Sequence, residues 1–218
     1  YGDIWCLTYL KRAYLFDSNT EKFIDVLGPL EAEREQTFVV QRIISLPKGV
    51  AWIVCDQGYN FRIDESLIKK NKGITMFSTF NNTVKGENVY NIHQDADGDE
   101  WILTNKGATI VGNKTINSDF PFHTITERND EIWLSRNNGK LAKFDKSTVT
   151  PQFIEVPSYI ERINALEIID NRTLALGTDE SLVLFDTQSN TFKHIHILGP
   201  TQKDQHITHI FKDRTGEL

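Results

Sequence analysis

The fold of this chain is decided by the stretch Asp95 to Gly107, which reads DADGDEWILTNKG. It begins with a turn, because Asp97-Gly98 supplies residues that tolerate the backbone conformation of a tight strand reversal. The run Trp101 to Thr104 combines an aromatic residue with β-branched and aliphatic ones, which is typical of a packed β-strand. A second break at Asn105 to Gly107 precedes another apolar run, Ala108 to Val111. The stretch therefore predicts one unit of a β-meander.

The same unit recurs along the chain around an anchor residue, which is a tryptophan in the first four copies. In the clearest copy, Trp101 is followed by Thr104 three positions later and by Gly107 six positions later. The anchors lie at Trp5, Trp52, Trp101, Trp133 and Ala175. A sixth copy begins at 207–218 and ends before its anchor position. Spacings of this size match β-propellers, whose four-stranded blades repeat about every 40–50 residues.

Each repeat offers four strand candidates, which we call a to d in chain order. Strand a precedes the anchor, b contains it, c ends near a Phe-Asp pair, and d lies near the next phenylalanine. We therefore predict an all-β fold, a β-propeller of four-stranded antiparallel blades, to which residues 1–218 belong. No window shows sustained helical spacing of apolar residues, and the best helical candidate, Glu31 to Gln36, is one short polar turn. A parallel β-helix would need shorter repeats, and a β-sandwich does not repeat such a unit.

The two ends of the sequence leave two architectures open. Strand a of the sixth copy either completes the first blade and closes a ring of five blades, or belongs to a larger propeller of which this chain is a piece. Closure would place Gly216-Glu217-Leu218 and Gly2-Asp3-Ile4 at equivalent positions, which duplicates a turn. We therefore expect part of a larger propeller.

The composition argues against several functions. The chain has 218 residues, 39% of them hydrophobic, which suffices for a large core. A net charge of −6 argues against a nucleic-acid-binding surface, and Lys69-Lys70-Asn71-Lys72 is predicted to be a solvated loop. No apolar run is long enough to span a bilayer, so we predict no direct membrane insertion. Cys6 and Cys55 follow different anchors on strand faces that point the same way round the ring, which predicts two free thiols.

Motifs for catalysis or for cofactor binding are weak. The sequence has no Gly-x-Ser-x-Gly, no Gly-rich phosphate loop and no His-Glu-x-x-His, so we predict no catalytic residue and no cofactor. The acidic run Asp95 to Glu100 and Asp213 lack the spacing of a calcium loop, and Asp before Gly suits a tight turn. His194-Ile195-His196 and His206-x-x-His209 lack a spaced third ligand for zinc. We predict no metal site, and we interpret the anchor tryptophans as core side chains rather than as a carbohydrate platform.

Blade geometry predicts the face on which a ligand would bind. The b-to-c loops and the d-to-a connections emerge on one face of a propeller, and the a-to-b turns on the other. The a-to-b turns here are tight and similar, whereas the b-to-c loops differ in every repeat and carry polar and aromatic residues, as binding loops do. The candidate ligand-binding residues on the b-to-c loops are Tyr9, Lys11, Arg12, Asp56, Gln57, Asn105, Lys106, Arg136, Asn137, Asn138, Asp179 and Glu180.

The repeat itself resembles a known one. Asp97 to Gly107, and again Asp213 to Leu218, resemble the two-component regulator propeller repeat, Asp-x-x-Gly-x-Leu/Ile-Trp-Ile-Gly-Thr-x-x-Gly-Leu followed by an aromatic-Asp pair. The aromatic-Asp pairs of this chain are Phe16-Asp17, Phe144-Asp145 and Phe185-Asp186, and Leu176-Gly177-Thr178 matches the middle of the repeat. The resemblance covers essentially the whole chain, although Cys55 and Arg136 replace the threonine and Ala175 the tryptophan.

The resemblance implies the periplasmic sensor region of a hybrid two-component system histidine kinase, which regulates transcription in response to glycan-derived ligands. It implies a non-catalytic fragment that binds an oligosaccharide or other small ligand. The implied partners are the rest of the propeller and the downstream signalling domains of the same chain, and signalling through a homodimer is one option. Alternatives are a propeller lyase or hydrolase acting on polysaccharide, and a protein-interaction scaffold. An enzyme should show carboxylates or histidines clustered with tyrosine or arginine near the ring axis.

Overall fold

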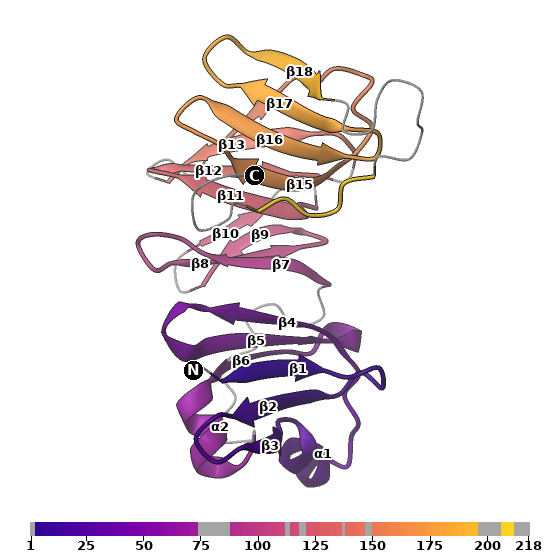
Figure 1. Cartoon of the computed structure of the whole chain (residues 1–218), viewed down its shortest axis with the longest axis vertical. Helices are drawn as coiled ribbons and strands as arrows, with labels where there is room; N and C mark the ends of the chain where they lie inside the picture. Colours follow the sequence, from indigo (N-terminus) through magenta and orange to yellow (C-terminus); the bar gives the residue numbers. More distant parts are fainter. Residues whose placement is uncertain are drawn as a thin grey trace. The chain divides into compact units, whose positions relative to one another are not determined.

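The structure is a computed structural model, and it is built mainly of antiparallel strands arranged in sheets (Figure 1). It describes residues 3–73, 88–111, 114–117, 121–136, 138–146, 150–195 and 206–211. Contacts within the chain divide it into two compact units, residues 1–94 and residues 95–218, and each unit is described by itself.

The described part of the first unit contains two antiparallel sheets of three strands, ordered β1-β2-β3 and β4-β5-β6 (Figure 1). Their strands are β1 (Ile4–Leu7), β2 (Ala13–Asp17), β3 (Lys22–Asp25), β4 (Val40–Leu46), β5 (Val50–Cys55) and β6 (Asn60–Asp64). Helix α1 (Gly28–Arg34) follows β3, and helix α2 (Glu65–Asn71) follows β6. As described, these two sheets therefore have three strands and not the predicted four. In the second sheet α2 follows the third strand, and the predicted fourth strand falls in residues 74–87, which lie outside the described residues.

Helix α2 lies where the sequence predicted a solvated loop. Asp64 caps its first turn, because the carboxylate accepts a hydrogen bond of 2.8 Å from the backbone N–H of Ser66. Ile68 is buried in the core of the unit, and the Lys69 amine forms an ion pair with Asp3. Apolar burial and the cap explain why this basic stretch is helical. Within the described part of the chain, no helix is long and apolar enough to cross a bilayer.

The remaining sheets have the four antiparallel strands that the repeat predicted, in the orders β10-β9-β8-β7, β11-β12-β13-β14 and β15-β16-β17-β18. The unit division falls between β7 (Val89–Gln94) and β8 (Glu100–Thr104). The other strands are β9 (Gly107–Ile110), β10 (Lys114–Asn117), β11 (Thr124–Arg128), β12 (Glu131–Ser135), β13 (Leu141–Asp145), β14 (Pro151–Ile154), β15 (Ile163–Ile168), β16 (Thr173–Thr178), β17 (Leu182–Asp186) and β18 (Thr191–Ile195).

Every anchor lies on the strand that the repeat predicted for it, strand b of its sheet. Trp5 lies in β1, Trp52 in β5, Trp101 in β8, Trp133 in β12 and Ala175 in β16. Trp52, Trp101 and Trp133 are each 1% exposed, so the core interpretation is confirmed for these three, while Trp5 is half-buried.

The cores of the second unit lie between consecutive sheets. Trp101 of β8 meets Phe144 of β13 edge to face, with ring centroids 6.4 Å apart. Trp133 of β12 meets Phe185 of β17 in the same way at 6.0 Å. The aromatic residue that ends strand c therefore packs against the anchor of the preceding sheet, which is the physical reason for both motifs.

The acidic residues of the a-to-b turns serve the turns themselves. One carboxylate oxygen of Asp95 accepts the backbone N–H groups of Asp97 and Asp99 at 3.1 and 2.9 Å, and the other accepts the indole N–H of Trp101 at 3.0 Å. The Asp170 carboxylate likewise accepts the N–H groups of residues 172 and 173. Such side chains stabilise a turn by satisfying backbone donors that no strand reaches.

Both cysteines are free, as predicted. Cys55 is buried at the end of β5, and burial raises the pKa of its thiol to about 12. Cys6 is half-buried on β1.

Candidate ligand-binding groove

The predicted site residues of the first unit lie around two b-to-c loops. Tyr9 is 98% exposed at the tip of the loop between β1 and β2, and Lys11 ends that turn with a left-handed backbone. Arg12 instead points into the protein, where its guanidinium pairs with Asp25 at 3.0 Å and with Glu31. Asp56 follows β5 and its carboxylate accepts the backbone N–H of residue 39. The side chain of residue 57 lies outside the described part.

The predicted site residues of the second unit follow β8, β12 and β16. Asn105 and Lys106 form the tight turn between β8 and β9. Arg136 is half-buried, and its backbone N–H donates to the carbonyl of Lys140 at 2.9 Å to close the next b-to-c loop. Burial lowers the pKa of the Arg136 guanidinium. Residue 137 lies outside the described residues, while Asn138, Asp179 and Glu180 line hollows of the surface.

The largest of these hollows is a groove of about 650 Å³ in the second unit. One wall is the b-to-c loop Asn138–Lys140 between β12 and β13, and the other is the end of β14 with the d-to-a connection 155–161. The two walls meet where Gly139, at φ +71°, approaches Ile160 so closely that a Cβ there would lie 2.1 Å from the Ile160 carbonyl oxygen. The groove thus lies on the face that blade geometry predicted for a ligand.

The groove has an apolar floor and a polar, aromatic rim. Ile154, Val156 and Ile160 line it from below and belong to the core cluster around Trp133, which gives the floor a packed support. On the rim, Phe153 of β14 is 47% exposed. The polar rim residues are Asn138, Lys140, Glu155, Ser158 and Glu161. An apolar floor with a few polar groups around it is the ordinary composition of a small-molecule site.

An aromatic pair lies beside the groove. Tyr159 is 45% exposed, and its ring packs on the imidazole of His194 from β18 with centroids 4.4 Å apart. The Nδ1 atom of His194 lies 3.0 Å from the hydroxyl oxygen of Ser181, which fixes the imidazole. A second, small hollow lined by Tyr159, Glu161, Asp179 and Glu180 shares Glu161 with the groove. The two hollows therefore adjoin.

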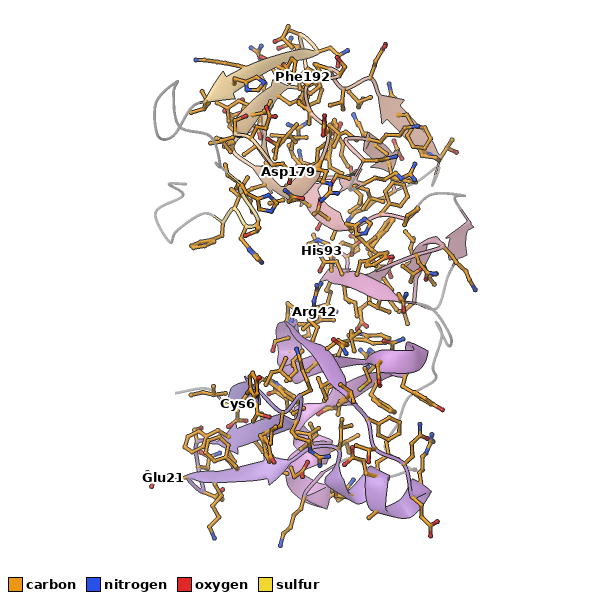
Figure 2. The ribbon with its side chains drawn as sticks, turned by 90° about the vertical axis from the view of Figure 1, so that its right-hand side faces the viewer. Cys6, Glu21, Arg42, His93, Asp179 and Phe192 are labelled. Carbon is orange, nitrogen blue, oxygen red and sulfur yellow. The ribbon has the colours of Figure 1, made fainter. Side chains whose placement is uncertain are left out.

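Asp179, at the end of β16 (Figure 2), gathers donors from neighbouring segments. Its carboxylate accepts the side-chain N–H of Asn164 at 2.8 Å and lies 2.9 Å from the imidazole Nδ1 of His206 and 3.6 Å from the Nε of Arg162. The backbone N–H of Ile207 donates to the carbonyl of residue 178, so the start of the sixth repeat packs on this loop. Arg162 and His206 thus accompany the two predicted residues of this loop.

A second charged region lies at the opposite end of the sheet formed by β11–β14. We call Lys146, Asp95, Asp97 and Glu127 the Lys146 hub: the amine lies 2.8 Å from Asp97 and 3.2 Å from Asp95, and it also contacts Glu127. The Asp95 side chain is 1% exposed and that of Lys146 14%. Burial alone would lower the pKa of Lys146, but the three carboxylates outweigh it and raise that pKa. The hub joins the turns of two consecutive sheets.

The histidines that suggested zinc do not converge. His194 contacts Ser181 and Tyr159, whereas His206 contacts Asp179, and His209 contacts Thr208. Among the described residues, no three His, Cys, Asp or Glu side chains are placed to hold a metal ion. His196 lies outside them.

Sequence reasoning missed the residues of the d-to-a connection. Tyr159 and Glu161 lie between β14 and β15, where loop residues carry no repeat signal, whereas Phe153 lies in β14, the strand d of its repeat. The available signal was compositional: Pro157-Ser158-Tyr159 is a turn-forming run with an aromatic residue, bounded by Glu155 and Glu161.

No protein-family model and no curated protein matches this chain. Among solved structures, it is similar to the extracellular domain of BT4673 from B. thetaiotaomicron, with a TM-score of 0.65 and 14% identity. BT4673 has been described both as a one-component system and as a hybrid two-component system. That match covers 98% of this chain and 30% of the other. A catalytically inactive virginiamycin B lyase from Staphylococcus aureus, crystallised with quinupristin, matches with a TM-score of 0.60 and 16% identity over 93% of this chain and 69% of its own.

At these identities the likeness shows the fold. The neighbours are propeller-like, which agrees with the repeat of all-β sheets in this chain. The sequence resembles the sensor region of hybrid two-component systems, and one structural neighbour is an extracellular domain described as part of such a system. This chain spans about 30% of that domain's length.

Proposed function

We propose that this chain is a ligand-sensing part of the extracytoplasmic region of a hybrid two-component sensor histidine kinase, with the ligand bound in the groove beside Tyr159. Two independent observations support this. The repeat resembles that of such sensors, and the fold is similar to an extracellular domain assigned to one. The groove lies on the face where b-to-c loops and d-to-a connections gather.

The observation that carries the proposal is the combination of polar groups with two exposed aromatic rings, Phe153 at the groove and Tyr159 at the adjoining hollow. Phe153 and Tyr159 are 47% and 45% exposed, so two large aromatic rings keep much of their apolar surface in contact with solvent. An exposed aromatic ring offers a face to a flat, partly apolar ligand such as a pyranose ring. The polar rim supplies hydrogen-bond partners for hydroxyl groups. A glycan-derived ligand uses both features.

The wider organisation is part of the same proposal. We infer that the repeats at Trp5, Trp52, Trp101, Trp133 and Ala175, with a sixth begun at 207–218, form part of a larger propeller in residues 1–218 and beyond. The rest of that propeller and the downstream signalling domains would be partners within one chain, in the periplasm. Ligand binding would pass a conformational change, or a homodimerisation, to the kinase and so regulate transcription.

A polysaccharide-acting enzyme, a lyase or hydrolase, is the second candidate. The observation that favours it is the gathering of Tyr159, His194, Arg162 and Asp179 on one face, since tyrosine and histidine can act as general acids or bases and an arginine can stabilise developing negative charge. The remaining b-to-c loop residues would suit a protein-interaction scaffold. Incubation of the protein with polysaccharides, followed by chromatography of the products, separates an enzyme from a sensor.

The test of the proposed function is binding to an array of oligosaccharides, followed by calorimetry of any hit with the wild-type chain and two variants. Tyr159→Ala removes the exposed ring and should weaken binding by at least about tenfold, the scale of one lost stacking contact. Tyr159→Phe retains the ring and should bind nearly as well as the wild type. An affinity that is unchanged in Tyr159→Ala, or the absence of binding to any oligosaccharide, contradicts the proposal.

A further inference from the structure

We infer that the groove takes an uncharged oligosaccharide and discriminates against anionic ones such as uronates or sulfated glycans. This rests on the proposed function, because it names the ligand class for the same groove.

The charged groups around the hollows are predominantly acidic. Glu155 and Glu161 line the groove, and Glu180 lines the adjoining hollow. Among the described residues, none of these three carboxylates has an ion-pair partner. Against them stands Lys140, the one cationic residue among the described residues that line the groove. A ligand in the groove therefore meets a net negative rim.

Asp179, the fourth acidic residue of this region, differs from the other three because it has hydrogen-bond and ion-pair partners. Asp179 has Asn164, His206 and Arg162 within reach, so its charge is partly compensated by protein donors. Arg162 and His206 are thereby engaged at Asp179 and not at the groove. Among the described lining residues, an anionic ligand would meet Glu155 and Glu161 with Lys140 as the one cation.

Uncompensated carboxylates and exposed rings together fit an uncharged sugar. Carboxylates are strong acceptors for hydroxyl donors, and charge-assisted hydrogen bonds are stronger than those between neutral groups. Phe153 and Tyr159 supply aromatic faces against which pyranose rings can stack, and this stacking does not require a charge on the sugar. Attraction to hydroxyl groups and repulsion of carboxylates thus come from the same side chains, which is how specificity against a close analogue arises.

The expected discrimination is moderate. Two like charges roughly 8 Å apart in water repel enough to weaken binding by about twofold. The two rim carboxylates and Glu180 of the adjoining hollow, facing a ligand with several uronates, should therefore weaken binding by about tenfold at low salt. Because the Debye length falls from about 10 Å at 0.1 M salt to about 3 Å at 1 M, the discrimination should largely vanish in 1 M sodium chloride.

The experiment uses matched probes and matched variants. Neutral gluco-, galacto- and manno-oligosaccharides are each compared by calorimetry with the same oligosaccharide oxidised at C6 to the uronate. Glu155→Gln combined with Glu161→Gln removes two rim charges while retaining size and hydrogen bonding. The control is Glu21→Gln, which removes an exposed carboxylate of the other unit (Figure 2). Tyr159→Ala shows whether a probe binds in the groove.

The inference is supported if a neutral probe binds about tenfold more tightly than its uronate, and if the double variant, unlike Glu21→Gln, narrows the gap to about threefold. A uronate that binds at least as tightly as its neutral counterpart, and loses binding in Tyr159→Ala, overturns the charge inference and leaves the proposed function standing. Absence of binding by every probe to the folded protein overturns the proposed function, and the inference with it.

Discussion

The Lys146 hub and the candidate ligand-binding groove lie at opposite ends of the sheet formed by β11–β14, and they use charge in opposite ways. In the hub, Lys146 is surrounded by Asp95, Asp97 and Glu127, and two of those carboxylates are largely buried. At the groove, carboxylates face solvent beside exposed rings and have no ion-pair partner among the described residues. Charges satisfied inside the protein belong to the scaffold, whereas exposed groups with unused bonding capacity remain available to a ligand.

The hub side should show the largest effects on stability. Trp101→Ala removes a side chain that is 1% exposed and that packs against Phe144. The cavity and the lost indole bond to Asp95 should lower the free energy of unfolding by about 3–5 kcal/mol. Urea unfolding monitored by circular dichroism measures the change. A loss below about 1 kcal/mol would contradict the assignment of this anchor to the core.

Removing the hub cation should cost almost as much. Lys146→Met retains the aliphatic stem but leaves the buried Asp95 carboxylate without its cation, which should lower the free energy of unfolding by about 3 kcal/mol. The matched control is Lys143→Met. Lys143 pairs with Glu131 where both side chains are about 30% exposed, so about 1 kcal/mol or less is expected there. Equal losses in the two variants would contradict the structural role of the hub.

The contact between the groove walls gives a third test. Gly139→Ala places a Cβ 2.1 Å from the Ile160 carbonyl oxygen at a left-handed backbone position, so we expect a loss of about 3 kcal/mol together with weaker ligand binding. In Gly98→Ala, the backbone is also left-handed but no atom lies within 4 Å of the new Cβ, so a loss of about 1 kcal/mol is expected. Denaturant unfolding and calorimetry report the two effects, and equal behaviour of the variants would refute the wall contact.

The hub also predicts a pH dependence. Burial alone would raise the pKa of Asp95, but hydrogen bonds from Trp101, Asp99 and Lys146 outweigh it and lower that pKa. Since the native pKa lies below the unfolded value of about 3.9, the stabilisation is complete above that value and is lost as the pH falls through the native pKa. Asp95→Asn should therefore reduce the loss of stability between neutral and acidic pH. An unchanged slope of unfolding free energy against pH would contradict this.

The sequence predicted the parts of the molecule that repeat. Anchor tryptophans such as Trp101 and phenylalanines such as Phe144 recur at fixed positions of the repeat because they fill the space between neighbouring sheets. Aspartates such as Asp95 recur because the turn needs a hydrogen-bond acceptor. The helix after β6 was missed, although Asp64 before Glu65-Ser66 is a capping signal.

The groove could be predicted only as a face. The variation of the b-to-c loops predicted Asn138, Asp179 and Glu180, and these residues line the groove or the adjoining hollow, while their part in binding stays a prediction. Tyr159 was not found, because its role depends on a connection folding back until Ile160 meets Gly139. Contacts between loops of different strands have no period in the sequence. Arg12 shows the converse, since a polar loop residue can be engaged by Asp25 within the protein.

Hydrogen–deuterium exchange with and without a bound oligosaccharide tests the central claim most directly, because it reads the groove and the hub in one experiment. The ligand should slow exchange in peptides covering 138–140 and 155–161, and leave those covering 95–99 and 127–131 unchanged. Protection confined to the hub peptides, or saturating ligand without protection at 155–161, would contradict the assignment of the groove as the ligand site.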